Sequence, residues 1–272
     1  MKLALRIDVS TRRGAKEGVP RLIDMLAQHH ARATFFLALG PDRLWGQGSL
    51  PGRESGRRWA GIFRSIRDAG FEAGIQAFDP VRWPQRIAQA DAAWTKRQLE
   101  LSCEAFLRLF DTPPHAHGAT DWQMNCHAWR LTQRVGFRYA SDARGICPFI
   151  PVRNAEIVAC PQLPTTLPTL DEVAARDGVA LEDSVPRILE VTARPVQAGH
   201  VFSLRADREG LNRATLFERL LEGWRAQGYA LAALEDCLED VNLARLPRHN
   251  IVEGALPGRT SPVALQGKEF LA

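Results

Sequence analysis

Short runs of apolar residues alternate along the chain with longer segments whose apolar positions recur every three or four residues. The runs are typical of strands buried on both faces, and the longer segments are typical of amphipathic helices. We predict strands at residues 3–7, 33–39, 71–75, 115–118, 138–141, 157–164 (with an exit loop), 200–206 and 229–234. We predict helices at residues 19–30, 55–69, 95–110, 125–135, 181–193, 214–227 and after the last strand through residue 241.

This repeated strand–helix order predicts an α/β protein with a parallel sheet and helices outside it. About seven such units indicate an imperfect (β/α) barrel, in which a functional site lies at the C-terminal ends of the strands. We expect one domain over residues 1–272. Residues 247–272 contain three prolines and no clear period, so we expect an irregular C-terminal strap there.

The composition is typical of a globular protein and argues against membrane-spanning, secreted and nucleic-acid-binding proteins. The 272 residues are 45% hydrophobic, which is ordinary for a globular domain. No apolar run approaches the roughly 20 residues that span a bilayer, and Arg6 and Asp8 interrupt the first apolar stretch, so we expect neither a transmembrane segment nor a signal peptide. Five widely spaced cysteines indicate a reducing, cytoplasmic setting. The net charge of +4 comes from scattered residues, so we expect no nucleic-acid partner.

Polar residues follow most of the predicted strands, at the end where a barrel site forms. Because parallel strands share this end, we expect these side chains to meet around one mouth. They are Asp8 after the first strand, Gln76 and Asp79 after the third, His117 and residues 121–123 (Trp122 and Gln123 among them) after the next, Asp142 and Arg144, and finally Arg205 and Asp207.

Seven stretches in chain order resemble the polysaccharide deacetylase (NodB-homology) superfamily, and most of all its ArnD-like branch, the 4-deoxy-4-formamido-L-arabinose-phosphoundecaprenol deformylases. The resemblance implies an α/β fold with a deformed (β/α)7-type barrel, and hydrolysis of a carbohydrate N-formyl or N-acetyl amide at a divalent metal. The stretches are LRIDVSTRRG, ATFFLALGPD, GIQAFDPVRW, HGATDWQMN, YASDARG, PQLPTTLPTLDEV and HVFSLRADREG.

The residues that carry the chemistry of this family are substituted here. The resemblance places Asp8 at the general-base position and Ser10 where a ligand carboxylate belongs. Gln76 and Pro80 stand at the two metal-binding histidine positions, and Arg205 stands at the general-acid histidine position. Of these five residues, only Asp8 has the kind of side chain that its family role requires. Arg205 cannot act as a general acid, because arginine stays protonated at useful pH. We therefore expect no metal cofactor, and we expect Arg205 to fill the metal's volume and pair with Asp8.

Several other pocket positions leave two alternatives open. Asp142 and Arg144 match the family pattern and either orient site groups or form a structural ion pair. Trp122 is either a sugar-stacking wall, which its polar loop favours, or a core residue. Thr165 and Thr166 either present hydroxyls to a ligand or belong to a proline-stiffened loop over the barrel mouth. The stretch 43–50 is short compared with the basic amphipathic insertion typical of the branch.

Three functions follow from these substitutions. The first is a catalytically degenerate homologue, a pseudoenzyme that binds a sugar or sugar-lipid, regulates, or partners an active paralogue. The second is a hydrolase that works without metal, with Asp8 as base and the Arg205 guanidinium stabilising an oxyanion. The third is an ordinary metal-dependent deacylase. We favour the first.

Overall fold

The computed structural model describes residues 1–41 and 55–271, so the short stretch 43–50 lies outside the described residues. A parallel sheet forms the centre of the molecule, with strand order β5-β4-β3-β2-β1-β8 and with β9 paired to β1. Its strands are β1 (Lys2–Val9), β2 (Thr34–Leu37), β3 (Glu72–Ile75), β4 (Ala116–His117), β5 (Tyr139–Ala140), β8 (His200–Arg205) and β9 (Ala230–Ala232).

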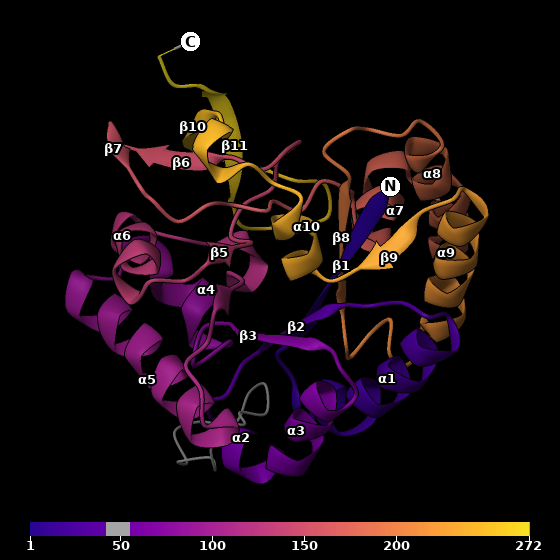
Figure 1. Cartoon of the computed structure of the whole chain (residues 1–272), viewed down its shortest axis with the longest axis horizontal. Coiled ribbons are helices and arrows are strands. Elements are labelled where there is room, and N and C mark those ends of the chain that lie inside the picture. The colour runs from indigo at the N-terminus through magenta and orange to yellow at the C-terminus, as the bar shows by residue number, and fades with distance from the viewer. Residues whose placement is uncertain (42–54, 272) are drawn as a thin grey trace.

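Helices surround this curled sheet on its outer side (Figure 1). None of the described helices is both long enough and apolar enough to cross a membrane. They are α1 (Val19–Gln28), α2 (Ser55–Arg58), α3 (Ala60–Asp68), α4 (Arg82–Arg86), α5 (Ala92–Phe110), α6 (Cys126–Val135), α7 (Leu170–Asp177), α8 (Ser184–Thr192), α9 (Ala214–Ala226) and α10 (Leu234–Glu239), with short turns η1 (Gly14–Gly18), η2 (Ile87–Gln89), η3 (Thr120–Trp122), η4 (Leu181–Asp183) and η5 (Leu243–Arg245).

The barrel is closed by a loop instead of a strand pair. Strands β5 and β8 stand at the two ends of the sheet and are bridged by residues 163–167. The amide of Leu163 donates to the carbonyl of Ala140 at 2.8 Å, and the amide of Thr166 donates to the carbonyl of Val201 at 3.1 Å. The expected deformed α/β barrel is therefore confirmed.

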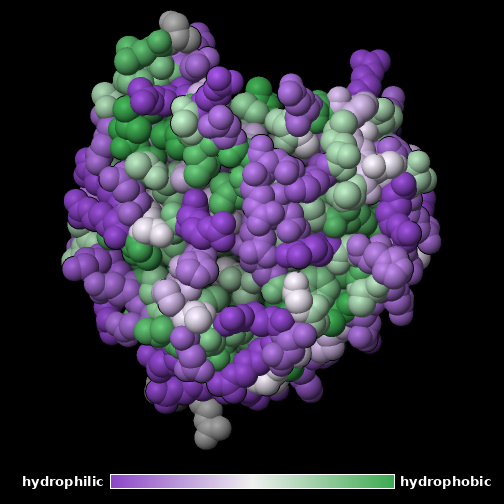
Figure 2. Space-filling model, viewed as in Figure 1, coloured by the Kyte–Doolittle hydropathy of each residue, from purple (hydrophilic) through white to green (hydrophobic). Residues whose placement is uncertain are grey.

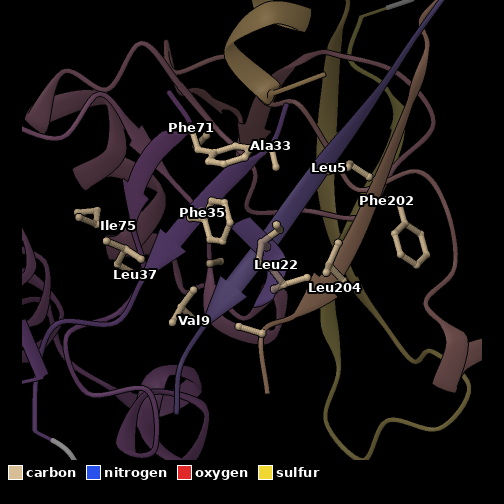
Figure 3. Close-up of a cluster of buried hydrophobic side chains, with 14 of the residues drawn as sticks. Leu5, Val9, Leu22, Ala33, Phe35, Leu37, Phe71, Ile75, Phe202 and Leu204 are labelled. Atoms are coloured by element: carbon tan, nitrogen blue, oxygen red, sulfur yellow. The ribbon is translucent and has the colours of Figure 1, made fainter. Parts of the chain in front are cut away.

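Alternation along the strands divides the apolar side chains into two cores. Successive side chains of a strand point to opposite faces, so Leu5, Ile7 and Val9 of β1 face the helices while Arg6 and Asp8 face the barrel interior. Figure 3 shows the outer core, in which side chains of β1, β2, β3 and β8 gather around Leu22 of α1. This layer sets the positions of the strand ends that carry the site.

The inner core is small and is filled mainly by one aromatic ring. Phe36 is fully buried and packs with Tyr139 and with Leu234 of α10. A Cβ atom on either Gly74 or Gly118 would lie 2.7 Å from the Phe36 ring. Glycine at these two positions therefore makes room for the ring, and α10 covers the N-terminal end of the barrel.

The expectation of an irregular C-terminal strap is wrong. Residues 248–254 and 263–269 form the antiparallel strands β10 (Arg248–Gly254) and β11 (Val263–Glu269). They join β6 (Ile150–Arg153) and β7 (Glu156–Ile157) in a second sheet of order β11-β10-β6-β7. The pairing of β10 with β6 connects segments about a hundred residues apart, which a local pattern cannot reveal.

Other differences from the sequence prediction are local. The predicted helix at 55–69 is two helices, α2 and α3, separated at Trp59. Helix α7 was not predicted, although Thr169 and Glu172 form a capping box at its start. Residues 157–164 are mostly irregular: Ile157 belongs to β7, and Gln162 forms isolated bridges with Ala140 and Phe149. The face in Figure 2 is largely hydrophilic, with apolar atoms gathered near the second sheet, where Ile157 and Val252 are exposed.

Candidate functional site

A cavity of about 1050 Å³ opens at the C-terminal ends of the barrel strands. This is the end at which the strand order predicted a site. Half of the predicted pocket residues line it, and they come from four different strand exits. These six residues are Asp8, Ser10, Pro80, Trp122, Gln123 and Arg205.

The other six predicted residues lie behind the cavity wall and support it. Asp79 begins α4, because its carboxylate accepts hydrogen bonds from the amides of Val81 and Arg82 at 3.2 and 3.0 Å. Asp142 is fully buried and accepts from the amide of Ala119 at 2.8 Å. The remaining four, described below, are Gln76, Arg144, Thr165 and Thr166.

Ser10 follows β1 and Gln76 follows β3, and these two residues, which the resemblance places at metal-ligand positions, contact each other directly. The Ser10 hydroxyl donates to the Gln76 side-chain oxygen at 2.7 Å. Thr120 approaches the same oxygen at 3.5 Å, and Gln76 is fully buried. Ser10, which lines the cavity, and Gln76, which does not, therefore meet at one point in the cavity wall.

These side chains do not fit a divalent metal. Such sites use imidazoles and carboxylates, whereas Gln76 offers a single amide oxygen that already accepts the Ser10 hydroxyl. Pro80 has no donor atom at all. Among residues 1–41 and 55–271, no group of three or more histidine, cysteine, aspartate or glutamate side chains could hold a metal ion. We derive no chemical step through a metal here.

The predicted pairing of Asp8 with Arg205 is wrong, because Asp8 pairs with Arg6. The guanidinium of Arg6 meets both carboxylate oxygens of Asp8, at 3.1 Å from Nε and 3.3 Å from Nη2. Residues two apart on a strand share a face, so Arg6 already lies beside Asp8. Burial raises the pKa of Asp8, and the charge of Arg6 opposes that rise.

Arg205 lies on the same barrel face but turns away from Asp8. The two residues are register partners on β8 and β1. The Arg205 guanidinium nevertheless forms a two-point ion pair with Asp207, at 3.1 and 3.2 Å. Its backbone amide donates to the buried Glu209 at 2.8 Å. The arginine therefore forms part of the cavity wall and does not fill the space of a metal.

Trp122 lines the cavity as predicted, but it is also nearly buried, which favours the alternative of a core residue. The side chain lines the cavity but is only 2% exposed, and its indole nitrogen donates to Thr165 at 3.1 Å. Guanidinium groups of Arg6, Arg144 and Arg259 lie 5.1, 4.8 and 4.4 Å from its ring centre. The ring is therefore engaged by cations of the protein itself.

The two threonines of the closing loop also act structurally, which corrects the idea that they present hydroxyls to a ligand. Thr165 accepts the bond from Trp122, and the Thr166 hydroxyl accepts the amide of Val201 at 2.9 Å. Neither residue lines the cavity described above. Arg144 is an ion-pair residue, because it contacts both oxygens of the buried Glu172 at 2.9–3.0 Å.

Sequence reasoning missed most of the charged residues of the cavity wall. Asp121 was expected at the mouth, but Asp171, Glu172, Arg208 and Arg259, which also line the cavity, were not. Asp171 accepts bonds from both Arg208 and Arg213, and these arginines hold its pKa below the ordinary value against the effect of burial. The Thr-x-x-Glu capping signature was a sequence signal for Glu172, but no local pattern pointed to Arg259.

Comparisons of the sequence identify homologues over almost the whole chain. A "probable" 4-deoxy-4-formamido-L-arabinose-phosphoundecaprenol deformylase ArnD of Shewanella sediminis is 28% identical, and the alignment covers 94% of this chain and 88% of that protein. The protein of the same name in Wigglesworthia glossinidia brevipalpis is 23% identical, with 94% and 99% covered. No protein-family model matches the chain.

Solved structures share the fold. A crystal structure described as a polysaccharide deacetylase from Mycobacterium smegmatis superposes with a TM-score of 0.73 at 19% identity, covering 94% of each chain. A CE4-family pseudoenzyme from Bacillus anthracis gives a TM-score of 0.54 at 15% identity, covering 92% of this chain and 69% of its own. A mutant of that pseudoenzyme, described as having restored enzymatic activity, gives 0.55 at 14% identity, with 87% and 67% covered.

The deformed barrel is the fold of the solved polysaccharide deacetylase structures, and together with the sequence relatives it supports an assignment to the NodB-homology superfamily. The similarity to the proteins from Shewanella and Wigglesworthia, which extends over almost the whole chain, supports an assignment to the ArnD-like branch.

Proposed function

We propose that this ArnD-like chain is a pseudoenzyme that binds a carbohydrate and does not hydrolyse it with a metal. The observation that carries the proposal is the Ser10–Gln76 hydrogen bond of 2.7 Å, which joins two positions that hold metal ligands in the family. Pro80 stands at the third such position. A hydroxyl, an amide and a proline cannot replace a carboxylate and two imidazoles as zinc-type ligands.

The cavity supports binding of a hydroxyl-rich ligand. Both carboxylates and guanidinium groups line its wall, and Ser10, Thr11 and Thr169 add hydroxyl groups. Such groups both donate and accept hydrogen bonds, as sugar hydroxyls require. The names of its homologues refer to a sugar linked to phosphoundecaprenol, so a sugar or sugar-lipid is the ligand class that we propose. A cytoplasmic setting and an active paralogue as partner belong to the same proposal.

Metal-free hydrolysis is the weaker alternative. It requires Asp8 to accept a proton and Arg205 to stabilise an oxyanion. Asp8 is held by Arg6 through two contacts, and the guanidinium of Arg205 is held by Asp207. Both side chains therefore already have partners within the protein.

Metal content tests the proposal directly. The protein is purified from cells grown with added zinc, manganese and cobalt, and bound metal is quantified per chain. We expect near-zero metal in the natural protein and about one ion per chain in the triple variant Ser10→Asp, Gln76→His, Pro80→His, which restores the ligand types. The matched control, Ser10→Asn, Gln76→Asn, Pro80→Ala, changes the same positions and should stay empty.

About one tightly bound metal per chain in the natural protein would contradict the proposal. Ligand binding is measured in parallel by thermal shift and calorimetry with N-formyl and N-acetyl amino sugars, and release of formate or acetate is followed. We expect stabilisation without turnover. Chelator-insensitive turnover that Asp8→Asn abolishes would instead support the metal-free hydrolase.

A further inference from the structure

One wall of the cavity belongs to a loop of the second sheet. Residues 255–262 connect β10 to β11, and residues 257–261 of this loop line the cavity. Pro257, Gly258 and Thr260 are exposed, whereas Arg259 is partly withdrawn from water. The loop is therefore an exposed segment with one side chain directed into the barrel domain.

Arg259 makes three contacts across the cavity. Its Nη1 donates to Asp121 at 3.2 Å, and its Nε donates to Glu172 at 3.0 Å. Its guanidinium lies 4.4 Å from the centre of the Trp122 ring. Among the described residues, the side-chain hydrogen bonds between this loop and the barrel all come from Arg259. One side chain thus holds the loop in place.

The surface that receives Arg259 is preorganised. Glu172 is only 4% exposed and is fixed by Arg144 and by the capping box with Thr169. Asp121 and Trp122 both have φ of 53°, a left-handed conformation that is costly for residues other than glycine and persists where surrounding contacts impose it. Glu172 and Trp122 also have partners other than Arg259, since Arg144 and Thr169 hold Glu172 and Thr165 accepts a bond from Trp122.

The ends of the loop are held independently of Arg259. Ile251 and Val263 are buried in the flanking strands, and the amide of Arg144 donates to the carbonyl of Ala264 at 2.9 Å. Between these anchors the loop turns at Gly258, whose φ is +72° and which approaches Ala175 of α7. The segment can thus swing about fixed ends without unfolding the second sheet.

We propose that residues 255–262 form a lid over the cavity and that Arg259 is its latch. In the closed state Arg259 bonds Asp121 and Glu172 and covers Trp122. Opening breaks these contacts and widens access to the floor of the cavity at Ser10. This inference does not depend on the identity of the ligand or on the absence of catalysis, because it concerns only access.

The test measures access to the cavity floor. A Ser10→Cys variant is labelled with a bulky maleimide and with small methyl methanethiosulfonate, and modification of Cys at position 10 is followed by peptide mass spectrometry, which separates it from the native cysteines. Adding Arg259→Met should speed maleimide labelling about tenfold or more, since charge-assisted bonds hold the closed state. The small reagent should show a weaker effect.

Two further variants keep the test decisive. Arg153→Met is the control: it removes an ion pair of 2.8 Å with Glu253 in the second sheet but none of the contacts of Arg259. It should leave the labelling rate unchanged. Gly258→Ala retains Arg259 but places a Cβ 2.9 Å from that of Ala175 at a positive φ, and should also speed labelling. Equal maleimide rates in the parent, Arg259→Met and Gly258→Ala proteins, with thermal melting showing all three folded, would overturn the proposal.

Discussion

The two ends of the barrel each hold a carboxylate withdrawn from water, and they neutralise it differently. At the C-terminal end Asp8 faces the guanidinium of Arg6 at 3.1 and 3.3 Å. At the N-terminal end, no arginine or lysine of residues 1–41 and 55–271 forms an ion pair with Glu72. Its oxygens accept bonds from the hydroxyls of Thr34 and Tyr139 and from the amide of Glu235.

This difference shows that a fold can stabilise a buried acid with either a cation or a proton. Burial raises the pKa of both groups, and for Glu72 it raises the pKa to about 7, partly offset by the bonds from Thr34 and Tyr139. At the cavity, which opens to solvent, the Arg6–Asp8 pair stays charged. At the other end of the barrel, beneath α10, Glu72 is instead stabilised by binding a proton.

The largest expected effect comes from removing the cation. Arg6 is fully buried and also donates to the carbonyls of Ser141 and Ala119. Arg6→Met leaves Asp8 and both carbonyls without this partner, so the free energy of unfolding should fall by about 3–5 kcal/mol. Chemical denaturation measures this change.

The matched control for that prediction is Arg32→Met. Arg32 also contacts two carboxylates, Glu235 and Asp236, but its side chain is half exposed. Water screens such a pair, so its loss should cost about 0–1 kcal/mol. If Arg6→Met cost no more than Arg32→Met, the charge pair at the cavity would not be a stabilising element.

The second effect is a pH dependence that Glu72 introduces. Its pKa is 4.5 ordinarily and about 7 in the folded protein. Below pH 4.5 both states are protonated. Between pH 4.5 and about 7, Glu72 keeps its proton in the folded state but has lost it in the unfolded state, so the free energy of unfolding falls as pH rises. The stability difference between the natural protein and Glu72→Gln should fall by about 3 kcal/mol from pH 4 to pH 8.

Denaturation curves of both proteins at pH 4, 5, 6, 7 and 8 check this expectation. Taking the difference removes the contributions of other titrating groups, such as Asp171. A difference that stays flat, or that rises with pH, would mean that Glu72 is not held as the protonated acid.

The smallest effect tests one hydroxyl. The Tyr139 hydroxyl donates to Glu72 at 2.7 Å, so Tyr139→Phe should cost about 1–2 kcal/mol at pH 8 and should raise the pKa of Glu72 further. Tyr229→Phe is the control, because its hydroxyl donates to the neutral carbonyl of Thr192 at 2.8 Å. The loss of unfolding free energy in Tyr229→Phe should not vary with pH. If both variants showed the same pH profile, the role assigned to Tyr139 would be contradicted.

Much of the site could be predicted because parallel strands end on one side of a sheet. Asp8, Ser10, Pro80 and Arg205 follow three different strands and line one cavity. The ion-pair partners of these side chains could not be predicted in the same way. Arg205 was expected beside Asp8, yet Asp207 lies within reach and Arg6 already occupies that side of Asp8. An arginine side chain is long enough to reach several nearby carboxylates, and separation along the sequence does not predict which of them it pairs with.

The sequence by itself determined the barrel class and the end that carries the site, because these follow from periodicity and strand order. The resemblance to the deacetylase family added the expectation that the metal-ligand positions are substituted. Only the tertiary structure decided which charges pair, that Trp122 is covered by arginines, and that the C-terminal segment forms a sheet whose loop reaches the cavity. These features depend on contacts between residues far apart in the sequence, such as Asp121 and Arg259, which are 138 positions apart, and local patterns carry no information about such contacts.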